Sequence, residues 1–486
     1  MKRVAFFCIP AHGHTNPMLP VAAELVRRGN AVRFYSFDVF EKKIKATGAE
    51  FISCDAFLPK LSGQEEAGLK SVSTTEMTVQ DIRITLSMND FLDKEFRSFQ
   101  PDVVYTDSVC FWGKLNAWKH GVPMVVSTST FAFNQLSSGY MKNSLQETAD
   151  MIFGLPRIAR ELKKLKPCGY HVKNVLSLVQ SDNDTDSVVY TSRRFQPYVE
   201  SFSDHYAFVG PSVFSGVLPE KEKARPLVYI AMGTVINDRP DFYRKCIHAL
   251  GSLQVDVILS CGDFVNREEL GDLPEHIRVY PHVDQPAVLA RADVFLTHCG
   301  MNSVSESLYM AAPMVLYPQT GEQFAVARRV MEIGAGILLR DDSCAGIRAA
   351  VQEILGNEVY RNAAAEGSAD FRACSGAAGA AEFIEDAPHA SGGMDMIKEL
   401  NRVNAKCGLF YWLFVAAVIL LSGFLAGWQY ALIIGIAAGI LAAPVGRAMQ
   451  KRNYAGLCKR TDCCKILKGL PGNGLQAGRR ENGDEF

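Results

Sequence analysis

The sequence carries almost no net charge, which argues against a nucleic-acid partner. It has 51 Lys and Arg residues against 52 Asp and Glu residues among 486, a formal net charge of -1. A protein that binds along a phosphate backbone needs a surplus of basic residues, so no nucleic acid is expected as a partner. The one basic stretch follows residue 446 and is suited to anionic lipid headgroups.

Clustered cysteines and an export signal are also lacking. The 13 Cys residues are scattered and, outside the tail, show no metal-ligand spacing, so a reducing compartment is expected. In the tail, Cys458, Cys463 and Cys464 could be acylated or bind metal, and unmodified thiols in a flexible segment are the simpler interpretation. The apolar run behind the basic start of the chain ends at Pro10, which favours a first strand over a signal peptide.

What the sequence does contain is a strand, a glycine turn and a helix in the order that makes an anion site. Residues 292–297 are predicted as a buried strand, His298 and Gly300 lie in the turn, and Asn302 or Ser303 is expected to cap the helix. The free amides of a first helical turn attract a phosphate, and glycine lets it approach the backbone. Such units are common, so a purely structural role is the alternative.

The residues that follow strengthen the phosphate interpretation. Glu306 lies four residues after Asn302 on the same helix face, at the distance of a ribose hydroxyl. Another apolar strand is predicted over 314–318, and Glu322 and Gln323 follow it. Ligands of open α/β sheets bind at the carboxyl ends of strands, and adjacent carboxylate and amide groups suit sugar hydroxyls. The segment therefore predicts a nucleotide-sugar site.

This segment resembles the donor-sugar signature of the family one UDP-glycosyltransferases, which runs from W-x-x-Q through H-C-G-W-N-S and E to D/E-Q. The sequence departs from it at Met301, as bacterial macrolide-type members do, and at His282, where the family often has a uracil-stacking Trp. The resemblance implies that the imidazole of His282 or the backbone of Val283 takes that place. The retained positions are Gln285, His298, Gly300, Asn302, Ser303, Glu306, Glu322 and Gln323.

Two histidines follow the first predicted strand. After apolar residues 4–10 come His12 and His14, then Asn16 as the expected helix cap with Pro17 at the first helical position. Both histidines are therefore expected in a loop at the carboxyl edge of the sheet, where a polar loop role is the alternative. The segment resembles the amino-terminal motif of the same family, which implies that His14 is the general base.

The resemblance assigns two further positions. Neutral imidazole can take a proton at physiological pH but needs an orienting partner. A predicted strand ends with Asp107, which the resemblance pairs with His14, although capping of the next helix is an alternative. A strand predicted over 227–231 leads to Gly233 and Thr234, and the family's residue at this point contacts the diphosphate.

One apparent metal motif is set aside. Residues 182–186 contain the D-x-D of metal-dependent glycosyltransferases of another fold and faintly resemble a calcium loop. That loop needs Gly at position six and Glu at position twelve, where Ser187 and Arg193 stand. A solvated turn is predicted instead. Because helix amides and His298 would neutralise a diphosphate leaving group, no metal and no cofactor are expected, and the UDP-sugar is a co-substrate.

Alternating strand and helix signals predict an acceptor-binding Rossmann-like domain over 1–215 and a nucleotide-sugar-binding one over 226–388. The resemblance implies the GT-B fold, an α/β architecture in which two parallel-sheet domains face a cleft. Segments 57–90 and 136–167 lack strand patterning and are expected to form the acceptor walls. Apolar candidates for acceptor binding, which core packing would explain equally well, are Phe131, Phe133, Met141, Met151 and Phe153.

The end of the chain predicts a membrane element. A linker over 389–407 leads to residues 408–446, which carry no charge and are almost wholly apolar. At about 1.5 Å per residue, one helix would greatly exceed a bilayer core of about 30 Å, so a transmembrane or re-entrant helical hairpin is expected, with a single tilted helix as the alternative. Basic residues flank both sides and continue into a flexible tail over 447–486, which places the enzyme on the cytoplasmic side of the membrane.

Together these features predict an inverting glycosyltransferase that moves a hexose from a UDP-sugar to a hydroxyl of a lipophilic acceptor. His14 would remove the proton with support from Asp107, while Glu322 and Gln323 would hold the sugar. The family's association of a terminal Gln with glucose favours UDP-glucose. The alternatives are a UDP-sugar epimerase or hydrolase of related fold, and a membrane-tethered nucleotide-sugar sensor without catalysis. Retention of both His14 and Asp107 argues against the sensor.

Overall fold

The structure is a computed structural model with a main unit, Met1–Val199 with Asp204–Ser391, and a second unit, Glu200–Ser203 with Gly392–Phe486. The predicted linker, hairpin at 408–446 and most of the tail lie outside the described residues. No helix within the described part of the chain has the length and apolar character to cross a membrane. The described residues are 1–59, 73–134, 136–141, 145–172, 178, 185–212, 225–233, 236–263, 265, 267–389, 448 and 452–453.

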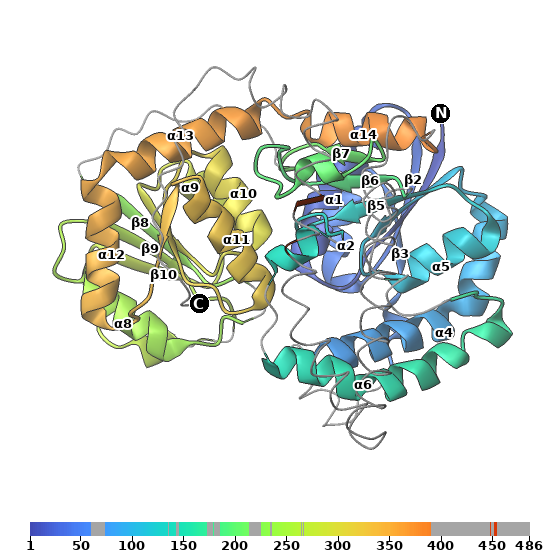
Figure 1. Ribbon diagram of the computed structural model, residues 1–486, viewed down its shortest axis with the longest axis horizontal. Helices are drawn as coiled ribbons and strands as arrows, with labels where there is room; N and C mark the ends of the chain where they lie inside the picture. Colours follow the sequence, from blue (N-terminus) through green and yellow to red (C-terminus); the bar gives the residue numbers. More distant parts are fainter. Residues whose placement is uncertain are drawn as a thin grey trace, which may run out of the picture. The chain divides into compact units, whose positions relative to one another are not determined.

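The first lobe of the main unit is built on a parallel sheet in the order β3-β2-β1-β4-β5-β6-β7 (Figure 1). The strands β1 and β4 are almost wholly buried and apolar, as expected where helices cover both faces of a parallel sheet. The strands are β1 (Arg3–Phe7), β2 (Ala31–Ser36), β3 (Glu50–Ser53), β4 (Val103–Asp107), β5 (Met124–Thr128), β6 (Ser187–Val189) and β7 (Tyr206–Phe208). The helices are α1 (His12–Arg27), α2 (Glu41–Lys45), α4 (Thr74–Phe99), α5 (Phe111–His120) and α6 (Leu145–Lys163).

The second lobe repeats this plan with a parallel sheet in the order β10-β9-β8-β11-β12-β13. Its strands are β8 (Leu227–Ala231), β9 (Asp256–Ser260), β10 (Ile277–Tyr280), β11 (Val294–Thr297), β12 (Met314–Leu316) and β13 (Gly336–Leu338). Its helices are α8 (Pro240–Leu250), α9 (Gln285–Leu289), α10 (Met301–Tyr309), α11 (Gly321–Glu332), α12 (Cys344–Gly356) and α13 (Glu358–Arg372), and α14 (Gly376–Asp386) follows them. The prediction of two Rossmann-like parallel-sheet domains is confirmed.

The strand order fixes where ligands can bind. In each sheet the chain starts in the middle, so the direction of the connections reverses between β1 and β4 and between β8 and β11. Ligands of open parallel sheets bind beyond the carboxyl ends of the strands at such a switch point. His14, Asp107, Gly233 and His298 lie at or just beyond the ends of these four strands, whereas His282 and Gln285 follow β10 and Glu322 and Gln323 follow β12.

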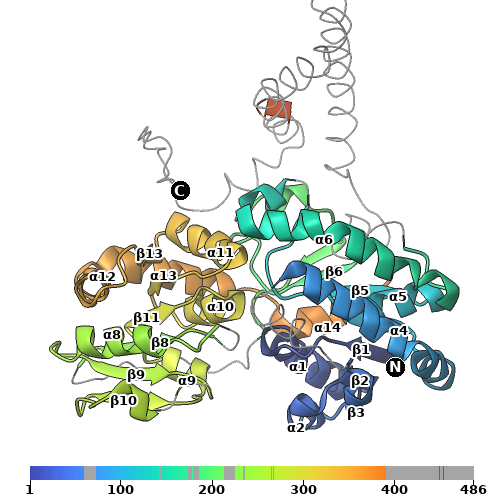
Figure 2. The same cartoon turned by 90° about the horizontal axis from the view of Figure 1, so that it is seen from below.

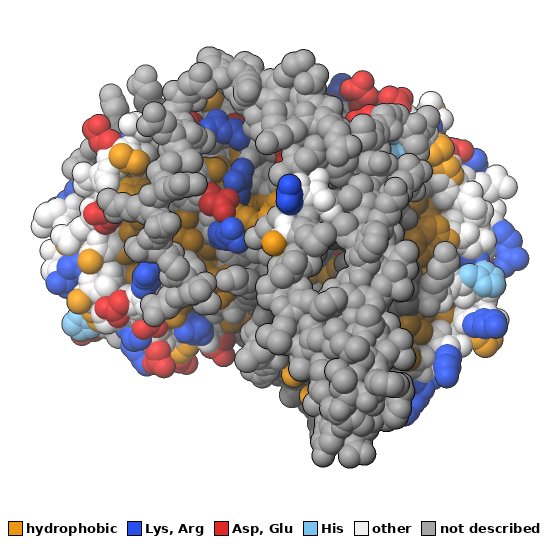
Figure 3. Space-filling model, in the orientation of Figure 1, with side chains coloured by type: hydrophobic (Ala, Val, Ile, Leu, Met, Phe, Trp, Pro, Cys, Tyr) orange, Lys and Arg blue, Asp and Glu red, His pale blue; other side chains and the backbone are white. Residues whose placement is uncertain are grey.

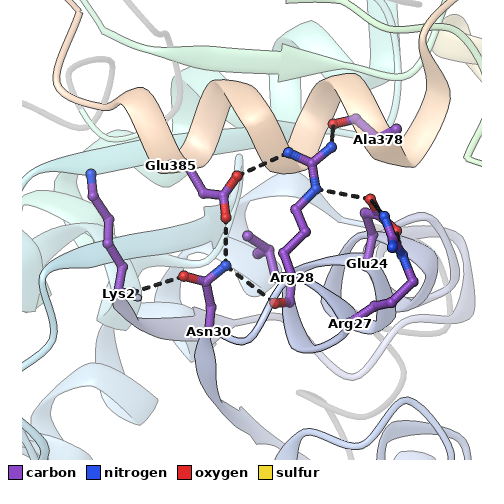
Figure 4. Close-up of polar contacts among 8 residues, drawn as sticks. Lys2, Glu24, Arg27, Arg28, Asn30, Ala378 and Glu385 are labelled. Atoms are coloured by element: carbon purple, nitrogen blue, oxygen red, sulfur yellow. Dashed lines mark hydrogen bonds and ion pairs between the residues drawn. The ribbon is translucent and has the colours of Figure 1, made fainter.

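The helix α14 packs on the first lobe, although the predicted second domain extends to residue 388. Its apolar stripe of Ala380, Ala381 and Ile384 joins the core that contains residues of β1 and α1. Burial of an Ile side chain alone contributes roughly 1.5–3 kcal/mol. Figure 4 shows the polar side of this contact, where the Glu385 carboxylate accepts hydrogen bonds from Arg28 at 2.9 Å and from Asn30 at 2.6 Å.

Both segments that lack strand patterning contain long helices. They are α4 and α6, which lie side by side in Figure 2. The solvated turn predicted at 182–186 is wrong at its last residue. The side chain of Asp186 is buried, with the Nδ1 atom of His205 at 2.5 Å and the backbone amide of His389 at 2.9 Å from its carboxylate oxygens. Asp182, Asn183 and Asp184 lie outside the described residues.

Acidic and basic side chains are interspersed over the described surface visible in Figure 3, in keeping with the small net charge. Among the described residues, no group of three or more His, Cys, Asp and Glu side chains is arranged to hold a metal ion.

Candidate active site

The first part of the site is a histidine and an aspartate on neighbouring elements of the first lobe. Asp107 ends β4, and its carboxylate lies 2.7 Å from the Nδ1 atom of His14 at the start of α1. The other carboxylate oxygen accepts a hydrogen bond from the Val109 amide at 3.0 Å. The cap of the next helix is Cys110, without a side-chain bond, so Asp107 does not cap that helix. The predicted pair of His14 and Asp107 is therefore assembled.

The start of α1 differs from the prediction. The helix begins at His12 with Ala11 as its cap, so both histidines lie in the first helical turn, and Asn16 and Pro17 lie inside the helix. Proline lacks the amide that would bond the carbonyl four residues earlier. That carbonyl belongs to Gly13, and it accepts a hydrogen bond from another lobe instead. The sequence rule that makes Asn16 the cap and Pro17 the first helical residue therefore fails here. A side chain from the second lobe supplies the donor that Pro17 lacks inside the helix.

The replacement donor is Asn302 of α10, whose side-chain nitrogen lies 2.7 Å from the Gly13 oxygen. This bond brings the histidine turn of the first lobe against the turn of the second lobe that was predicted to bind phosphate. Around it is a pocket to which both lobes contribute. Its lining residues are Asn16, Pro17, Tyr190, Pro211 and Ser212 from the first lobe and Asn302, Ser305 and Glu306 from the second.

The surroundings of His14 favour a basic imidazole. Its side chain is 29% exposed, so a substrate can reach it. Burial, the largest influence, lowers the pKa of His14, but the charge and hydrogen bond of Asp107 outweigh it and raise the pKa above its ordinary value, with smaller contributions from Glu322 and Asp81. The Ser129 hydroxyl is a second neighbour, 3.2 Å from the Nδ1 atom.

Sequence reasoning missed Asp81 and Ser129. Asp81 lies on α4, within electrostatic range of the His14 and Asp107 pair. Burial, together with the charge of Asp107, raises the pKa of Asp81 well above its usual range. A carboxylate inside an unpatterned helical segment gives no local signal, and Ser129 directly after β5 gives only the general one that strand ends carry function.

The second part of the site is the turn between β11 and α10. Gly300 is the cap residue of α10 and makes no side-chain bond, so the prediction that Asn302 or Ser303 caps the helix is wrong. The His298 imidazole lies between two glycines. A Cβ atom at Gly233 or at Gly300 would be 2.5 Å from its Nε2 atom. Burial lowers the pKa of His298 to about 4, so the imidazole is neutral at physiological pH.

Glu306, the residue predicted to meet the ribose, belongs to a hydrogen-bonded cluster. The Gln285 side-chain nitrogen donates to Glu306 at 2.7 Å and to Ser303 at 3.2 Å, and the Tyr229 hydroxyl donates to the Gln285 oxygen at 3.1 Å. Burial, opposed by the bond from Gln285, raises the pKa of Glu306 to about 7. Because Glu306 also lines the pocket beside Asn302, the expected shared helix face is confirmed.

The expected sugar-binding pair begins α11. Glu322 is exposed, and its charge contributes to the raised pKa of His14, which lies in the other lobe. The Gln323 side-chain oxygen accepts a hydrogen bond from the Gln319 amide at 2.7 Å, and the Thr320 hydroxyl accepts one from the Gln323 amide at 3.4 Å as the helix cap.

The two residues expected to stack on the base lie in different surroundings. His282 is exposed, and its Nε2 atom lies 2.9 Å from the Asp263 carboxylate. Its ring charge also contributes, after burial and Lys43, to the lowered pKa of His12. Val283 packs against the core of the second lobe. Thr234 lies outside the described residues.

The acceptor candidates are dispersed. Phe131 is 1% exposed and packs 5.6 Å from the ring of Phe195 in an apolar core that both lobes share, which makes it a core residue and not an acceptor wall. Phe133 is partly buried against the same core. Met141 is partly exposed, whereas Met151 and Phe153 are exposed on α6.

Comparisons with known proteins agree with this arrangement. Residues 244–383 match the family described as erythromycin biosynthesis protein CIII-like, C-terminal domain. The chain is 30% identical over 399 residues to the uncharacterized UDP-glucosyltransferase YojK of Bacillus subtilis (strain 168), covering 80% of this chain and 98% of that protein. It is 32% identical over 396 residues to the NDP-glycosyltransferase YjiC of Bacillus licheniformis, covering 79% and 97%.

A solved structure extends the agreement to the fold. The calicheamicin glycosyltransferase CalG4 superposes with a TM-score of 0.65 at 25% identity, covering 80% of this chain and 100% of that one. Both sheets and the residues His14, Asp107 and His298 lie between Arg3 and Leu338. The chain therefore belongs to the family one UDP-glycosyltransferases and is a glycosyltransferase of the GT-B fold, close to the macrolide glycosyltransferases.

Proposed function

We propose that this glycosyltransferase inverts the anomeric centre, with His14 as the general base. An acceptor hydroxyl gives its proton to the Nε2 atom of His14, because the Nδ1 atom is engaged by Asp107. The acceptor oxygen bonds to the anomeric carbon while the bond from that carbon to the diphosphate breaks. The electron pair of the broken bond leaves with the nucleoside diphosphate. Asp107 holds the imidazole in the required tautomer and stabilises the imidazolium ion that forms.

The proposed role of the second lobe is to bind the leaving group. The free amides at the start of α10 and the neutral His298 would donate hydrogen bonds to the diphosphate as its charge grows. Gly233 and Gly300 leave the space that the His298 ring occupies. Glu306, held by Gln285, would accept a bond from a ribose hydroxyl. This donor set accounts for the leaving-group charge without a metal ion, a point that adding a chelator to the assay tests.

For the donor we propose a UDP-hexose, with UDP-glucose first. The name of the relative YojK and the terminal Gln of the signature both favour it. Glu322 and Gln323 at the start of α11 would contact the sugar hydroxyls, and the electrostatic influence of Glu322 on His14 supports a sugar between them. A panel of UDP- and TDP-sugars, compared by kcat/KM, tests this choice.

For the acceptor we propose a lipophilic small molecule or lipid, glycosylated on the cytoplasmic side of a membrane. The support is residues 408–446, an uncharged apolar stretch with basic residues on both flanks, which we interpret as a transmembrane or re-entrant hairpin. Mass spectrometry of lipid and metabolite extracts incubated with the full chain and UDP-glucose would identify the product. Glycosylation of water-soluble compounds alone would contradict a lipophilic acceptor.

The observation that carries the proposed reaction is the His14–Asp107 pair, which lies across the bond between Gly13 and Asn302 from the phosphate turn. The test is His14→Ala in the full chain, which should reduce turnover by about 10²–10⁴ while UDP binding stays nearly unchanged. His12→Ala is the matched control, because that imidazole packs edge-on against Phe40.

The same assay separates the rival functions. Turnover that survives in His14→Ala would contradict the assignment of the base. Release of UDP by the unaltered enzyme without any acceptor would favour an epimerase or hydrolase. Binding of UDP-sugars without turnover across the acceptor panel would favour a sensor.

A further inference from the structure

The helix α6 exposes a group of large apolar side chains that are not buried in the core. Met151, Ile152, Phe153 and Leu155 are 38%, 57%, 84% and 46% exposed. Single exposed apolar residues are ordinary on a protein surface, but four within five positions form a patch that marks a binding surface. Phe153 is the strongest evidence for a binding surface, because an aromatic ring so exposed contributes almost nothing to the core.

The opposite face of α6 is fixed against α4, so the apolar patch cannot simply turn inward. Gly154 packs so closely on Thr75 that a Cβ atom would not fit. The Asp150 carboxylate accepts hydrogen bonds from Ser73 at 3.0 Å and from the Thr75 amide at 3.2 Å, and Ile158 is buried. Figure 2 shows the two helices running beside each other, with α6 on the outside of α4.

Basic side chains continue the same outward surface. Arg160, Lys163 and Lys166 are exposed, and in the part of the chain that the structure describes they form no ion pair. The nearby carboxylates are turned to other partners, since Asp150 bonds α4 and Glu161 is paired with Lys164 at 2.7 Å. The exposed surface of α6 is therefore apolar around Phe153, and Arg160 and Lys163 in its last turns, with Lys166 just beyond its end, are positively charged.

We infer that α6 docks on an anionic lipid bilayer, with Ile152, Phe153 and Leu155 inserted between the acyl chains and Arg160, Lys163 and Lys166 on the headgroups. Apolar side chains beside basic ones are what a helix lying in the membrane interface presents. Charge complementarity selects this partner, since negative lipids lower the free energy of each nearby basic side chain. The uncharged stretch at 408–446 offers no carboxylate that could pair with these cations.

This inference rests on the proposed reaction at a membrane surface and adds a docking surface to it. A lipid surface bound to α6 touches the acceptor-binding lobe itself, so a lipophilic acceptor could pass from the bilayer to the lobe that holds His14 without crossing water. The apolar positions Met151 and Phe153, expected from sequence to line the acceptor site, would contact the membrane from which the acceptor comes.

The test measures contact at α6 in the full chain, reconstituted into vesicles with and without brominated acyl chains. Phe153→Trp introduces a fluorophore in the patch, and Val359→Trp, at a site 63% exposed on α13, is the matched control. The unaltered chain supplies the background of the four native Trp residues. In equimolar phosphatidylcholine and phosphatidylglycerol, we expect the added signal of Phe153→Trp to be quenched by about half or more, as for a side chain within the acyl boundary, and that of Val359→Trp to be unchanged.

The charge on the helix gives a second reading. Phosphatidylcholine alone, or Arg160→Glu with Lys163→Glu in the Phe153→Trp chain, should reduce the quenching toward the control value, because removal of the lipid charge and reversal of the helix charge act on the headgroup contact. Equal quenching at positions 153 and 359 would overturn the proposal. A blue-shifted signal without lipid would also overturn it, and would assign the patch to another segment or a second copy of the chain. UDP release, measured in parallel, separates these failures from a failure of the proposed reaction.

Discussion

Asn302 donates a hydrogen bond of 2.7 Å to the carbonyl oxygen of Gly13, so a helix of the second lobe satisfies a backbone group of the first. In an uninterrupted helix the amide of residue 17 would be the donor, but Pro17 has none. The side chain of Asn302 thus replaces a missing helical bond. It also holds the turn that carries His14 against the turn that carries His298.

This relationship can be measured with a double-mutant cycle. Asn302→Ala should lower kcat/KM by about two- to tenfold, because one hydrogen bond contributes about 0.5–1.5 kcal/mol. Pro17→Ala supplies an amide that can bond the Gly13 carbonyl, so Asn302→Ala should cost less in that background. Comparing kcat/KM and the free energy of unfolding of the four chains gives the coupling. Equal losses in both backgrounds would assign Asn302 to donor binding alone.

The pair of His14 and Asp107 predicts a pH dependence with a definite sign. The base must be neutral to accept a proton, so kcat/KM should rise with pH through the pKa of His14. Asp107 raises that pKa against the opposing effect of burial. Asp107→Asn removes the charge, so the rise should move to lower pH while the plateau falls by about 10²–10⁴.

Asp102, just before β4, provides a control for this shift of the pH profile. Asp102→Asn removes a carboxylate that bonds Arg3 at the surface just before β4, and it should leave the pH profile in place. An Asp107→Asn profile that keeps its acidic limb at the original pH would mean that another group is the base.

The sequence predicted the strands well because they are continuous apolar runs. The strand at 227–231 and the strand ending at Asp107 have the expected ends, and the carboxyl-edge rule placed the motifs correctly once the sheet order was known. Helix starts were predicted less well. Asn16 with Pro17, and Asn302 at the second position of α10, have the local chemistry of caps, but each contributes to a contact between the lobes.

Other features depended on residues far apart in the chain. The return of α14 to the first lobe, through Glu385 with Arg28 and Asn30, joins positions about 355 apart and has no local pattern. The burial of Asp186 follows from His205 and His389, which also lie outside any motif. A single sequence shows the periodicity of each element but not the partner that satisfies a polar group, so these contacts could not be predicted.

The two glycines around His298 predict a steric test of the phosphate site. Gly300 has φ of -61°, which any residue adopts, so Gly300→Ala isolates the clash of a Cβ atom 2.5 Å from the imidazole. Overpacking of this kind costs roughly 1–3 kcal/mol, so we expect UDP affinity to fall about tenfold or more. Calorimetric titration with UDP measures it. Gly356→Ala, where nothing lies within 4 Å of the added Cβ, should bind UDP like the unaltered chain.

The buried carboxyl of Glu306 predicts how stability changes with pH. Its pKa in the folded protein is about 7, against an ordinary value of 4.5, so between these pH values the folded chain holds a proton that the unfolded chain has lost. The free energy of unfolding must then fall as pH rises from 4.5 to 7, by at most about 2–3 kcal/mol from this group.

Glu306→Gln keeps an oxygen that can accept the bond from Gln285 but does not titrate. It should therefore match the unaltered chain near pH 4.5 and be more stable above pH 7, as measured by chemical unfolding across this range. A difference that is the same at both ends would mean that the carboxyl does not change its pKa on folding.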